Sequence, residues 1–306
     1  MLAFIAPGQG AQTPGMLAPW ITDPAAKLLL SHWSHEIDLD LVRLGTTADS
    51  DEIKDTANAQ PLIVAAGLLG ARALGSARLA IVAGHSVGEI TAAAIAGVID
   101  DVDAMKLVRA RGIEMAKAAA LKPAGMAAVL GGDREIVLRA ISDLGLVAAN
   151  DNGGGQIVAA GDLDALAQLA PEGARVRALA VAGAFHTSYM QPAVAPLQEI
   201  AAKISVHAAK CPVISNKDGA VLHDGREILD RIVAQISSPV RWDLCITTLA
   251  SHVSGAVEVP PAGTLVGLLK RAVPIIETFA LKTTEDVTLA KEFIVRHKDE
   301  QNDEDK

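Results

Sequence analysis

The chain has 306 residues, of which 50% are hydrophobic and 3% aromatic, and its formal net charge is −9. This length suffices for one large domain, or for a main domain with a smaller inserted one, and the apolar content excludes disorder for most of the chain. The acidic balance argues against a general nucleic-acid surface, which needs a basic stripe to neutralise phosphates.

Export signals, membrane spans and metal sites are not indicated by the sequence. Residues 1–6 carry no basic leader and enter a predicted strand at once, which argues against a signal peptide. The longest Ala-rich runs contain charges and fall short of the roughly 20 apolar residues that a membrane helix needs. Cys211 and Cys245 lack the paired spacing of a zinc site and are too few for a disulfide scaffold. We therefore expect a cytoplasmic enzyme with reduced cysteines and no metal.

The first part of the chain predicts alternating strands and helices. Residues 2–6 form a short apolar run that ends in a turn-rich loop, and residues 60–74 have a helical apolar pattern. The branched run 79–83 predicts a buried strand, directly before Ser86. Small side chains dominate residues 89–98, which favours a helix packed closely on the sheet.

A further helix is predicted over residues 101–120, and the Pro-Ala-Gly sequence at 123–125 marks a domain boundary. The next segment predicts the order strand, helix, strand, strand, helix, strand, which is the ferredoxin-like pattern. Its predicted elements span residues 126–130, 134–144, 147–149, 156–160, 163–169 and 176–181.

The predicted fold is therefore α/β, with an α/β-hydrolase-like large domain that has a parallel central sheet and an inserted ferredoxin-like subdomain. Residues 1–124 and 182–296 are expected to form the large domain, and residues 125–181 the subdomain. Residues 297–306 contain mostly charged side chains and are expected to form a frayed tail.

The sequence Gly84-His85-Ser86-Val87-Gly88 matches G-x-S-x-G, the nucleophile elbow, in which flanking glycines allow a sharp turn that exposes the hydroxyl. A predicted strand before it and an apolar helix after it provide the required context. The plain structural alternative is a strand-to-helix turn with Ser86 as a helix cap. We interpret Ser86 as the covalent nucleophile of an acyl-transfer enzyme.

Arg111 lies on the apolar side of its predicted helix, next to Leu107, Val108 and Met115. A buried arginine needs an anionic partner, and a guanidinium can hold a carboxylate by two parallel hydrogen bonds. Either a structural Asp or Glu or the carboxylate of a substrate satisfies this requirement.

Five separated motifs occur in the order seen in malonyl-CoA:acyl carrier protein transacylases, and the sequence resembles this family from residue 1 to about residue 280. The motifs are Gly8-Gln9-Gly10-Ala11-Gln12, Gly84-His85-Ser86-Val87-Gly88-Glu89, Arg111-Gly112, Phe185-His186 and Ser238-Pro239-Val240-Arg241-Trp242.

The resemblance implies a catalytic dyad of Ser86 and His186, because no motif selects an Asp for a triad. It assigns the backbone carbonyl of Gln235 to the orientation of His186, a role that leaves the Gln235 side chain weakly constrained. It also assigns the oxyanion-hole donors to Val87 and Gln9.

The resemblance further implies that Arg111 holds the malonyl carboxylate, and that Asn150 and Asn152 face the cleft and contact the acyl or pantetheine portion. The alternative interpretation of the segment around these asparagines is a hairpin turn with no contact to substrate. The late segment Glu258-Val259-Pro260-Pro261-Ala262-Gly263 departs from the family's Glu-x-Gly-Pro-Gly pattern, which puts a catalytic use of this loop in doubt.

The implied function is ping-pong transfer of malonyl from malonyl-CoA to the phosphopantetheine thiol of acyl carrier protein, for fatty acid synthesis, without a cofactor. We expect a monomer that binds neither nucleic acid nor membrane. Phe185 favours malonyl over methylmalonyl, because methylmalonyl-selective relatives tend to have Ser there. The alternatives are an extender-unit acyltransferase of a polyketide pathway, a serine esterase and a non-catalytic module that binds carrier protein.

Overall fold

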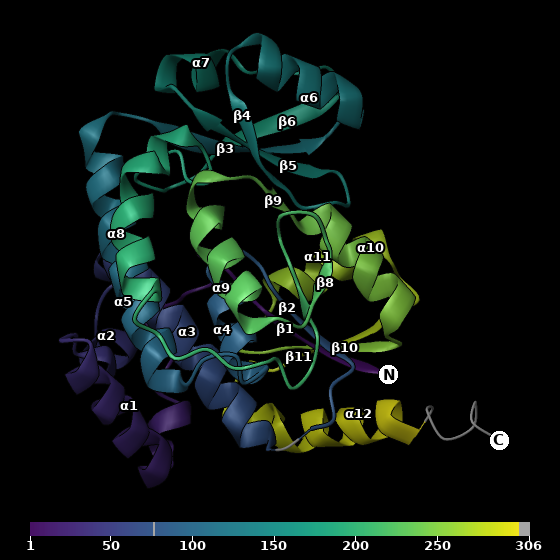
Figure 1. Ribbon diagram of the computed structural model, residues 1–306. Helices are drawn as coiled ribbons and strands as arrows, with labels where there is room; N and C mark the ends of the chain where they lie inside the picture. The colour runs from purple at the N-terminus through teal and green to yellow at the C-terminus, as the bar shows by residue number, and fades with distance from the viewer. Residues whose placement is uncertain (76, 300–306) are drawn as a thin grey trace.

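The computed structural model describes residues 1–75 and 77–299, and it contains two sheets. Figure 1 shows the smaller sheet and its two helices stacked above a larger α/β body. The large sheet has the strand order β11-β10-β1-β2-β7-β8, and all its pairs are parallel except the edge pair β7–β8. The predicted α/β class with a parallel central sheet is confirmed. The strands of this sheet are β1 (Leu2–Ala6), β2 (Ile81–Gly84), β7 (Val213–Ile214), β8 (Val221–Leu222), β10 (Gly255–Glu258) and β11 (Glu277–Ala280).

Helices cover both faces of the large sheet. Successive residues of a strand point to opposite faces, and here both sets are apolar, so each face needs a covering layer. Phe4 and Val82 belong to the hydrophobic cluster on one face, and Ile5 and Ala83 to the cluster on the other. The first face packs against α3 (Thr56–Leu74), α4 (Gly88–Ile95), α5 (Asp101–Leu121) and α12 (Val287–Asp299), and the second against α10 (Trp242–His252) and α11 (Thr264–Ala272). The remaining helices of the body are α1 (Pro24–Glu36), α2 (Leu41–Thr46), α8 (Gln191–Ala201) and α9 (Gly225–Ala234), with 3-10 turns η1 (Trp20–Thr22), η2 (Glu52–Lys54), η3 (Ser188–Met190), η4 (Gln235–Ser237) and η5 (Thr284–Asp286).

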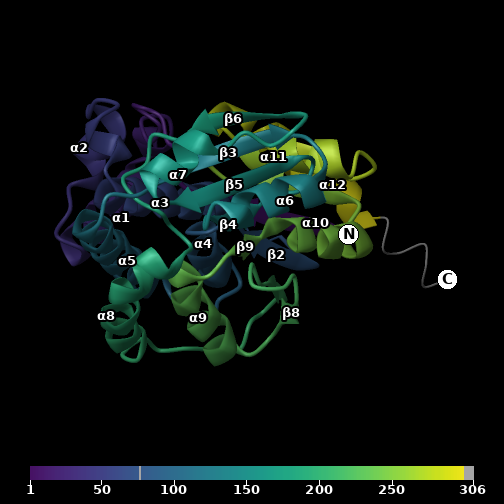
Figure 2. The ribbon, with the colours of Figure 1, turned by 90° about the horizontal axis from the view of Figure 1, so that it is seen from above.

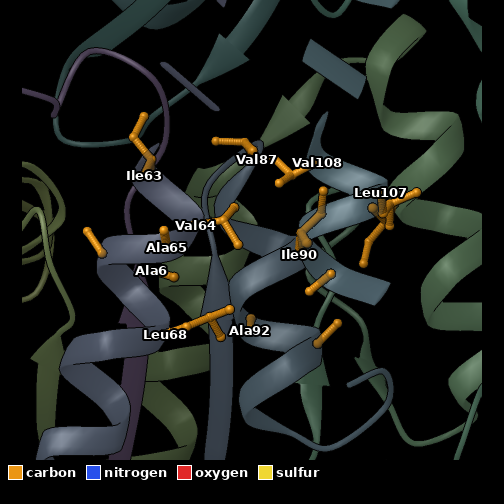
Figure 3. Packing of buried hydrophobic residues seen from close by; sticks show 14 of the residues in the cluster. Ala6, Ile63, Val64, Ala65, Leu68, Val87, Ile90, Ala92, Leu107 and Val108 are labelled. Atoms are coloured by element: carbon orange, nitrogen blue, oxygen red, sulfur yellow. The ribbon is translucent and has the colours of Figure 1, made fainter. Parts of the chain in front are cut away.

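The helix after the elbow packs very close to the sheet. Figure 3 shows Ile90 of α4 among side chains of α3 and α5, including Val64 and Val108. A Cβ atom on Gly88 would lie 2.2 Å from the Ala6 carbonyl oxygen, and one on Gly84 would lie 2.0 Å from the backbone of Gly88. The motif glycines are therefore required by the approach of α4 to β1 and β2.

The second sheet has the order β6-β3-β5-β4-β9. Its strands are β3 (Gly125–Gly131), β4 (Val147–Asp151), β5 (Gln156–Gly161), β6 (Ala174–Ala178) and β9 (Val240–Arg241), and its helices are α6 (Arg134–Asp143) and α7 (Leu163–Gln168). Figures 1 and 2 show both helices on the outer side of this sheet. The strand predicted over residues 176–181 is observed as Ala174–Ala178; the Leu179 N–H still donates to the Met126 carbonyl over 2.9 Å, and the Val181 N–H then donates to the Leu179 carbonyl in a turn.

Strand β9 was not foreseen. It follows α9 and η4 in the large domain, yet it pairs in parallel with β4, with Asn150 opposite Val240 and Asp151 opposite Arg241. A two-residue strand in a Ser-Pro-rich segment carries too little periodicity to be recognised from sequence. The second sheet therefore receives one strand from outside residues 125–181.

The prediction that a frayed tail begins at His297 was wrong. Helix α12 continues to Asp299, and His297 is buried with its ring centroid 4.5 Å from that of Phe293. His297 lies one helical turn after Phe293, so it belongs to the face that packs on the body. The rest of the predicted tail, residues 300–306, lies outside the described residues. Within the described residues no helix combines the length and apolar character needed to cross a membrane.

Candidate active site

Ser86 and His186 both adopt a backbone conformation that side chains disfavour. Ser86 has a φ of 54° and His186 a φ of 61°; among the described non-glycine residues, only Asp38 also has a positive φ. Such conformations cost of order 1–3 kcal/mol and cluster at functional sites. In Ser86 the strain follows from the turn between β2 and α4, which is the geometry of a nucleophile elbow.

The hydroxyl of Ser86 and the imidazole of His186 are hydrogen-bonded. The Ser86 Oγ lies 2.7 Å from His186 Nε2, and His186 Nδ1 lies 2.9 Å from the carbonyl oxygen of Gln235. A carbonyl can only accept, so Nδ1 carries the proton and Nε2 is free to accept the serine proton. Burial, followed by the charge of Arg111, lowers the pKa of His186 to about 3, so the imidazole is neutral near neutral pH.

The backbone N–H groups of Val87, next to Ser86 in the chain, and of Gln9, which lines the same cavity as Ser86, have no acceptor within the described residues. Val87 is the N-cap residue of α4 and is buried. The Gln9 side chain instead donates to Thr56 Oγ1 over 3.3 Å. A buried N–H at a helix N-terminus is suited to stabilise an anionic oxygen.

The Arg111 guanidinium is buried beside the nucleophile and makes no direct bond to a carboxylate of the residues that the structure describes. Its Nη1 donates to Gln60 Oε1 over 2.6 Å, and its Nη2 donates to Gln235 Oε1 over 3.0 Å and to Ser86 Oγ over 3.3 Å. Its Nε has no partner within the described residues. Burial lowers the pKa of Arg111 to about 10, a shift that the charge of Glu89 opposes, so the group stays positive.

One cavity of about 240 Å³ between the two sheets is lined by Ser86, His186, Arg111 and Gln9. Met126, Ala128 and Val158 of the small sheet form one wall, and Phe185 lies next to His186. Residues of α11, including Thr264 and Leu268, form another wall. The carboxylate of Glu258 accepts hydrogen bonds of 2.9 to 3.0 Å from three backbone N–H groups at the start of α11, so the late loop holds this wall.

Comparisons with known proteins decide the family. The acyl transferase domain model matches residues 3–300. The Mycobacterium tuberculosis protein called "Malonyl CoA-acyl carrier protein transacylase" is 52% identical over 296 residues, which cover 94% of this chain and 98% of that protein. The chain belongs to the acyl transferase family, among the malonyl-CoA:acyl carrier protein transacylases.

Solved structures of the family agree with this assignment. A crystal structure of the transacylase from Mycobacterium tuberculosis superposes with a TM-score of 0.91, over 94% of this chain and 98% of the other. A type II polyketide synthase acyl carrier protein in complex with its malonyl-transacylase matches with a TM-score of 0.89 at 30% identity, over 95% and 99% of the two chains. The Bacillus subtilis transacylase is 34% identical over 304 residues, or 94% of this chain and 96% of its own length.

Sequence reasoning missed several residues that hold the site of this family member together, among them Asn216 and Glu89. The Asn216 side chain accepts from the Ser86 N–H over 2.8 Å and donates to the Gly84 carbonyl over 2.7 Å, so it fixes both ends of the elbow. The buried carboxylate of Glu89 accepts from the Asn216 N–H over 2.6 Å and from Gln235 Nε2 over 2.5 Å. Burial raises the pKa of Glu89 to about 8, against the opposing effects of the Asn216 hydrogen bond and the charge of Arg111.

The expectation of a weakly constrained Gln235 side chain was wrong. Its Oε1 accepts from Arg111, and its Nε2 lies 3.2 Å from the Ser86 carbonyl oxygen as well as 2.5 Å from Glu89. One residue therefore orients His186 through its backbone and Arg111 through its side chain.

The two asparagines of the predicted hairpin segment differ in what they contact. Both line the cavity, but Asn152 Oδ1 accepts from His85 Nε2 over 2.8 Å and its Nδ2 donates to Gln156 over 3.1 Å. Asn150 is buried at 5% exposure, and its side chain makes no hydrogen bond within the described residues. Of the two amides, only that of Asn150 has all its donors and acceptors without a partner within the described residues.

Proposed function

We propose that this chain transfers a malonyl group from malonyl-CoA to the phosphopantetheine thiol of acyl carrier protein, through a malonyl ester on Ser86. The proposal rests on one observation: a general base, His186, and a group able to bind a carboxylate, Arg111, both contact the hydroxyl oxygen of Ser86. Ser86 Oγ lies 2.7 Å from the neutral His186 imidazole and 3.3 Å from the Arg111 guanidinium, which has no carboxylate partner in the described part of the chain. The relatives from Mycobacterium tuberculosis and Bacillus subtilis are both called malonyl CoA-acyl carrier protein transacylase, which supports the substrate pair.

In the first half-reaction, Ser86 Oγ attacks the thioester carbonyl while His186 Nε2 accepts its proton. The negative charge that develops on the carbonyl oxygen is stabilised by the Val87 and Gln9 N–H groups. Collapse of this intermediate breaks the carbon–sulfur bond, and the proton on His186 passes to the departing CoA sulfur. The malonyl ester of Ser86 and free CoA remain.

In the second half-reaction, the thiol of acyl carrier protein enters the same cavity and gives its proton to His186. The resulting thiolate attacks the ester, and the same N–H groups stabilise the second oxyanion. Ser86 leaves and recovers its proton from His186, which gives malonyl-acyl carrier protein. The Gln235 carbonyl keeps the imidazole in the required tautomer in both directions.

Selection for malonyl is assigned to Arg111, with a further contact from the Asn150 amide, while Asn152 acts through His85. A malonyl carboxylate would supply the anionic partner that the guanidinium lacks within the described residues, and burial of Arg111 would strengthen the charge-assisted hydrogen bonds between the two groups. The chemistry is complete with these side chains and an already activated thioester, so we propose that no cofactor takes part.

A direct test is to incubate the protein with malonyl-CoA and holo-acyl carrier protein, and to follow the carrier protein by intact mass. Malonyl-carrier protein is the expected product. Release of free malonate at the same rate, with or without carrier protein, would instead indicate an esterase. A preference for methylmalonyl-CoA would indicate a polyketide extender-unit enzyme, and Phe185 lining the cavity argues against the larger acyl group.

We also propose the domain division made above, with residues 125–181 inserted between residues 1–124 and 182–296. The two separate sheets support it, although β9 crosses from one part to the other.

We propose a cytoplasmic location, because the acyl donor is a CoA thioester. We also propose that the protein is a monomer, which light scattering can test.

Replacing His186 with glutamine should lower the rate of Ser86 malonylation by about 10²- to 10⁴-fold, because glutamine cannot accept the serine proton. The burst of CoA release on mixing with malonyl-CoA measures this step directly. His252→Gln, in α10 at a distance from the cavity lining, is the control and should leave the burst unchanged. An undiminished burst in His186→Gln would remove His186 from the mechanism.

The neutral state of His186 can be observed. Burial and Arg111 hold its pKa at about 3, so the free imidazole should remain unprotonated as the pH falls from 8 to 5. Its ring proton resonance in NMR, assigned by its absence in His186→Gln, should not move over this range. A titration midpoint between pH 6 and 7 would show that the imidazole is solvated as in a free histidine.

A further inference from the structure

A row of residues runs across the small sheet from the cavity to its free edge. Register pairs Asn150 with Val158, Val158 with Ala128, and Ala128 with Arg177. Residues that lie opposite each other in neighbouring strands point to the same face. Asn150, Val158 and Ala128 all line the cavity, so Arg177 stands on the cleft face, one strand beyond the cavity lining.

Alternation along β6 places a second arginine on the same face. Val176 and Ala174 pack with the cluster beneath α6 and α7, so Arg175 and Arg177 point to the opposite, cleft side. The chain continues to Leu179, which lines the cavity and whose N–H donates to the Met126 carbonyl over 2.9 Å. With about 3.3 Å per residue, Arg177 lies about 7 Å beyond Leu179 and Arg175 about 13 Å beyond it.

These two guanidinium groups have no acidic partner among the described residues. Both side chains are exposed, and no ion pair or hydrogen bond involves them. Two other arginines at this sheet are paired: Arg134, the first residue of α6, with Asp151 over 2.8 Å, and Arg241, in β9, with Asp243 over 2.7 Å. Arg175 and Arg177 therefore form a basic edge that is open on the side of the cleft.

We infer that Arg175 and Arg177 bind the phosphate of the phosphopantetheine arm while its sulfur end lies at Ser86. This inference rests on the proposed function. The arm and its phosphate are common to CoA and to holo-acyl carrier protein, and a guanidinium suits a phosphate because it offers several donors in one plane. The arm would enter along the cleft face of β6 and β3, past Leu179, and both substrates would use one entry path.

The test compares donors that differ in the phosphate. With malonyl-CoA, the double variant Arg175→Ala/Arg177→Ala should lose about 10-fold or more in kcat/KM for Ser86 malonylation, and the rate should become less sensitive to salt. With malonyl-pantetheine, which lacks the phosphate, wild type and variant should react equally. Arg139→Ala, an exposed arginine on α6 at the outer side of the sheet, is the matched control and should change neither rate.

The acceptor is tested in the same way, with holo-acyl carrier protein against free pantetheine. The variant should lose a similar factor with holo-carrier protein and none with pantetheine. A loss confined to CoA would point to its nucleotide phosphates, and a loss confined to carrier protein would point to the protein surface; either result overturns the inference, as does an equal loss with malonyl-pantetheine. Malonylation of Ser86 by malonyl-pantetheine reports separately on the proposed function.

Discussion

Replacing Ser86 with alanine is expected to abolish the acyl-enzyme and to lower kcat/KM with malonyl-CoA by about 10⁵- to 10⁶-fold. The alanine side chain has no oxygen to form the ester, whereas the His186, Val87 and Arg111 groups remain in place to bind the substrate. Residual turnover can come only from direct attack of the acceptor thiol within the cavity.

Intact-mass measurement after mixing with malonyl-CoA checks this directly. Wild-type protein should gain one malonyl group, and peptide mapping should locate it on Ser86. The Ser31→Ala variant, at an exposed serine on α1, should be labelled as fully as wild type. An adduct that persists in Ser86→Ala, or the absence of any adduct in wild type, would refute the covalent mechanism and would favour a non-catalytic module that binds carrier protein.

Replacing Arg111 with alanine should lower kcat/KM with malonyl-CoA by about 10³-fold. Removing the cation leaves the substrate carboxylate buried and unpaired, which costs about 3–5 kcal/mol. The effect should be selective. Acetyl-CoA has no carboxylate to be held, so its slow reaction should be unchanged or should improve when the positive charge is removed. The ratio of the two kcat/KM values is the quantity to measure.

Two further variants show whether the effect of Arg111→Ala comes from lost binding of the substrate carboxylate or from a disturbed fold of the site. Arg111→Lys keeps the charge but cannot make two parallel hydrogen bonds, so it should recover only part of the malonyl activity. Arg109→Ala removes an arginine from the same helix whose Nη1 donates to the Ala57 carbonyl, and it should leave the ratio unchanged. Equal losses of kcat/KM with acetyl-CoA and malonyl-CoA in Arg111→Ala would show that the guanidinium supports the fold of the site and does not bind the substrate carboxylate.

The sequence was informative where the chemistry is local. The strand, turn and small-residue helix around Ser86 can be read in one segment, and so can the apolar neighbours that bury Arg111. The structure and the comparisons agree on an α/β fold and on the transacylase family. The roles of the individual site residues stay predictions, which the variants above test.

The residues that support the site could not be found in this way, because their contacts join distant segments. Asn216 follows a two-residue strand and contacts the elbow 130 residues earlier in the chain. Gln60 reaches Arg111 from another helix, 51 residues away. A single polar side chain carries no periodic signal, and only the folded arrangement shows that its oxygen meets a particular donor. His297 was misassigned for a related reason, since charged neighbours concealed its packing on Phe293.

The pairing of β9 with β4 fixes the width of the cleft, because it joins the small sheet to a segment of the large domain. The stretch from Gln235 to Trp242 supports His186 at one end and is hydrogen-bonded into the small sheet beside Asn150 at the other. The small sheet therefore cannot swing away from the large one as a free lid without breaking this ladder and pulling on the support of the catalytic base. We therefore expect the acyl group to bind in a cavity of fixed width, because the segment that orients His186 also joins its two walls.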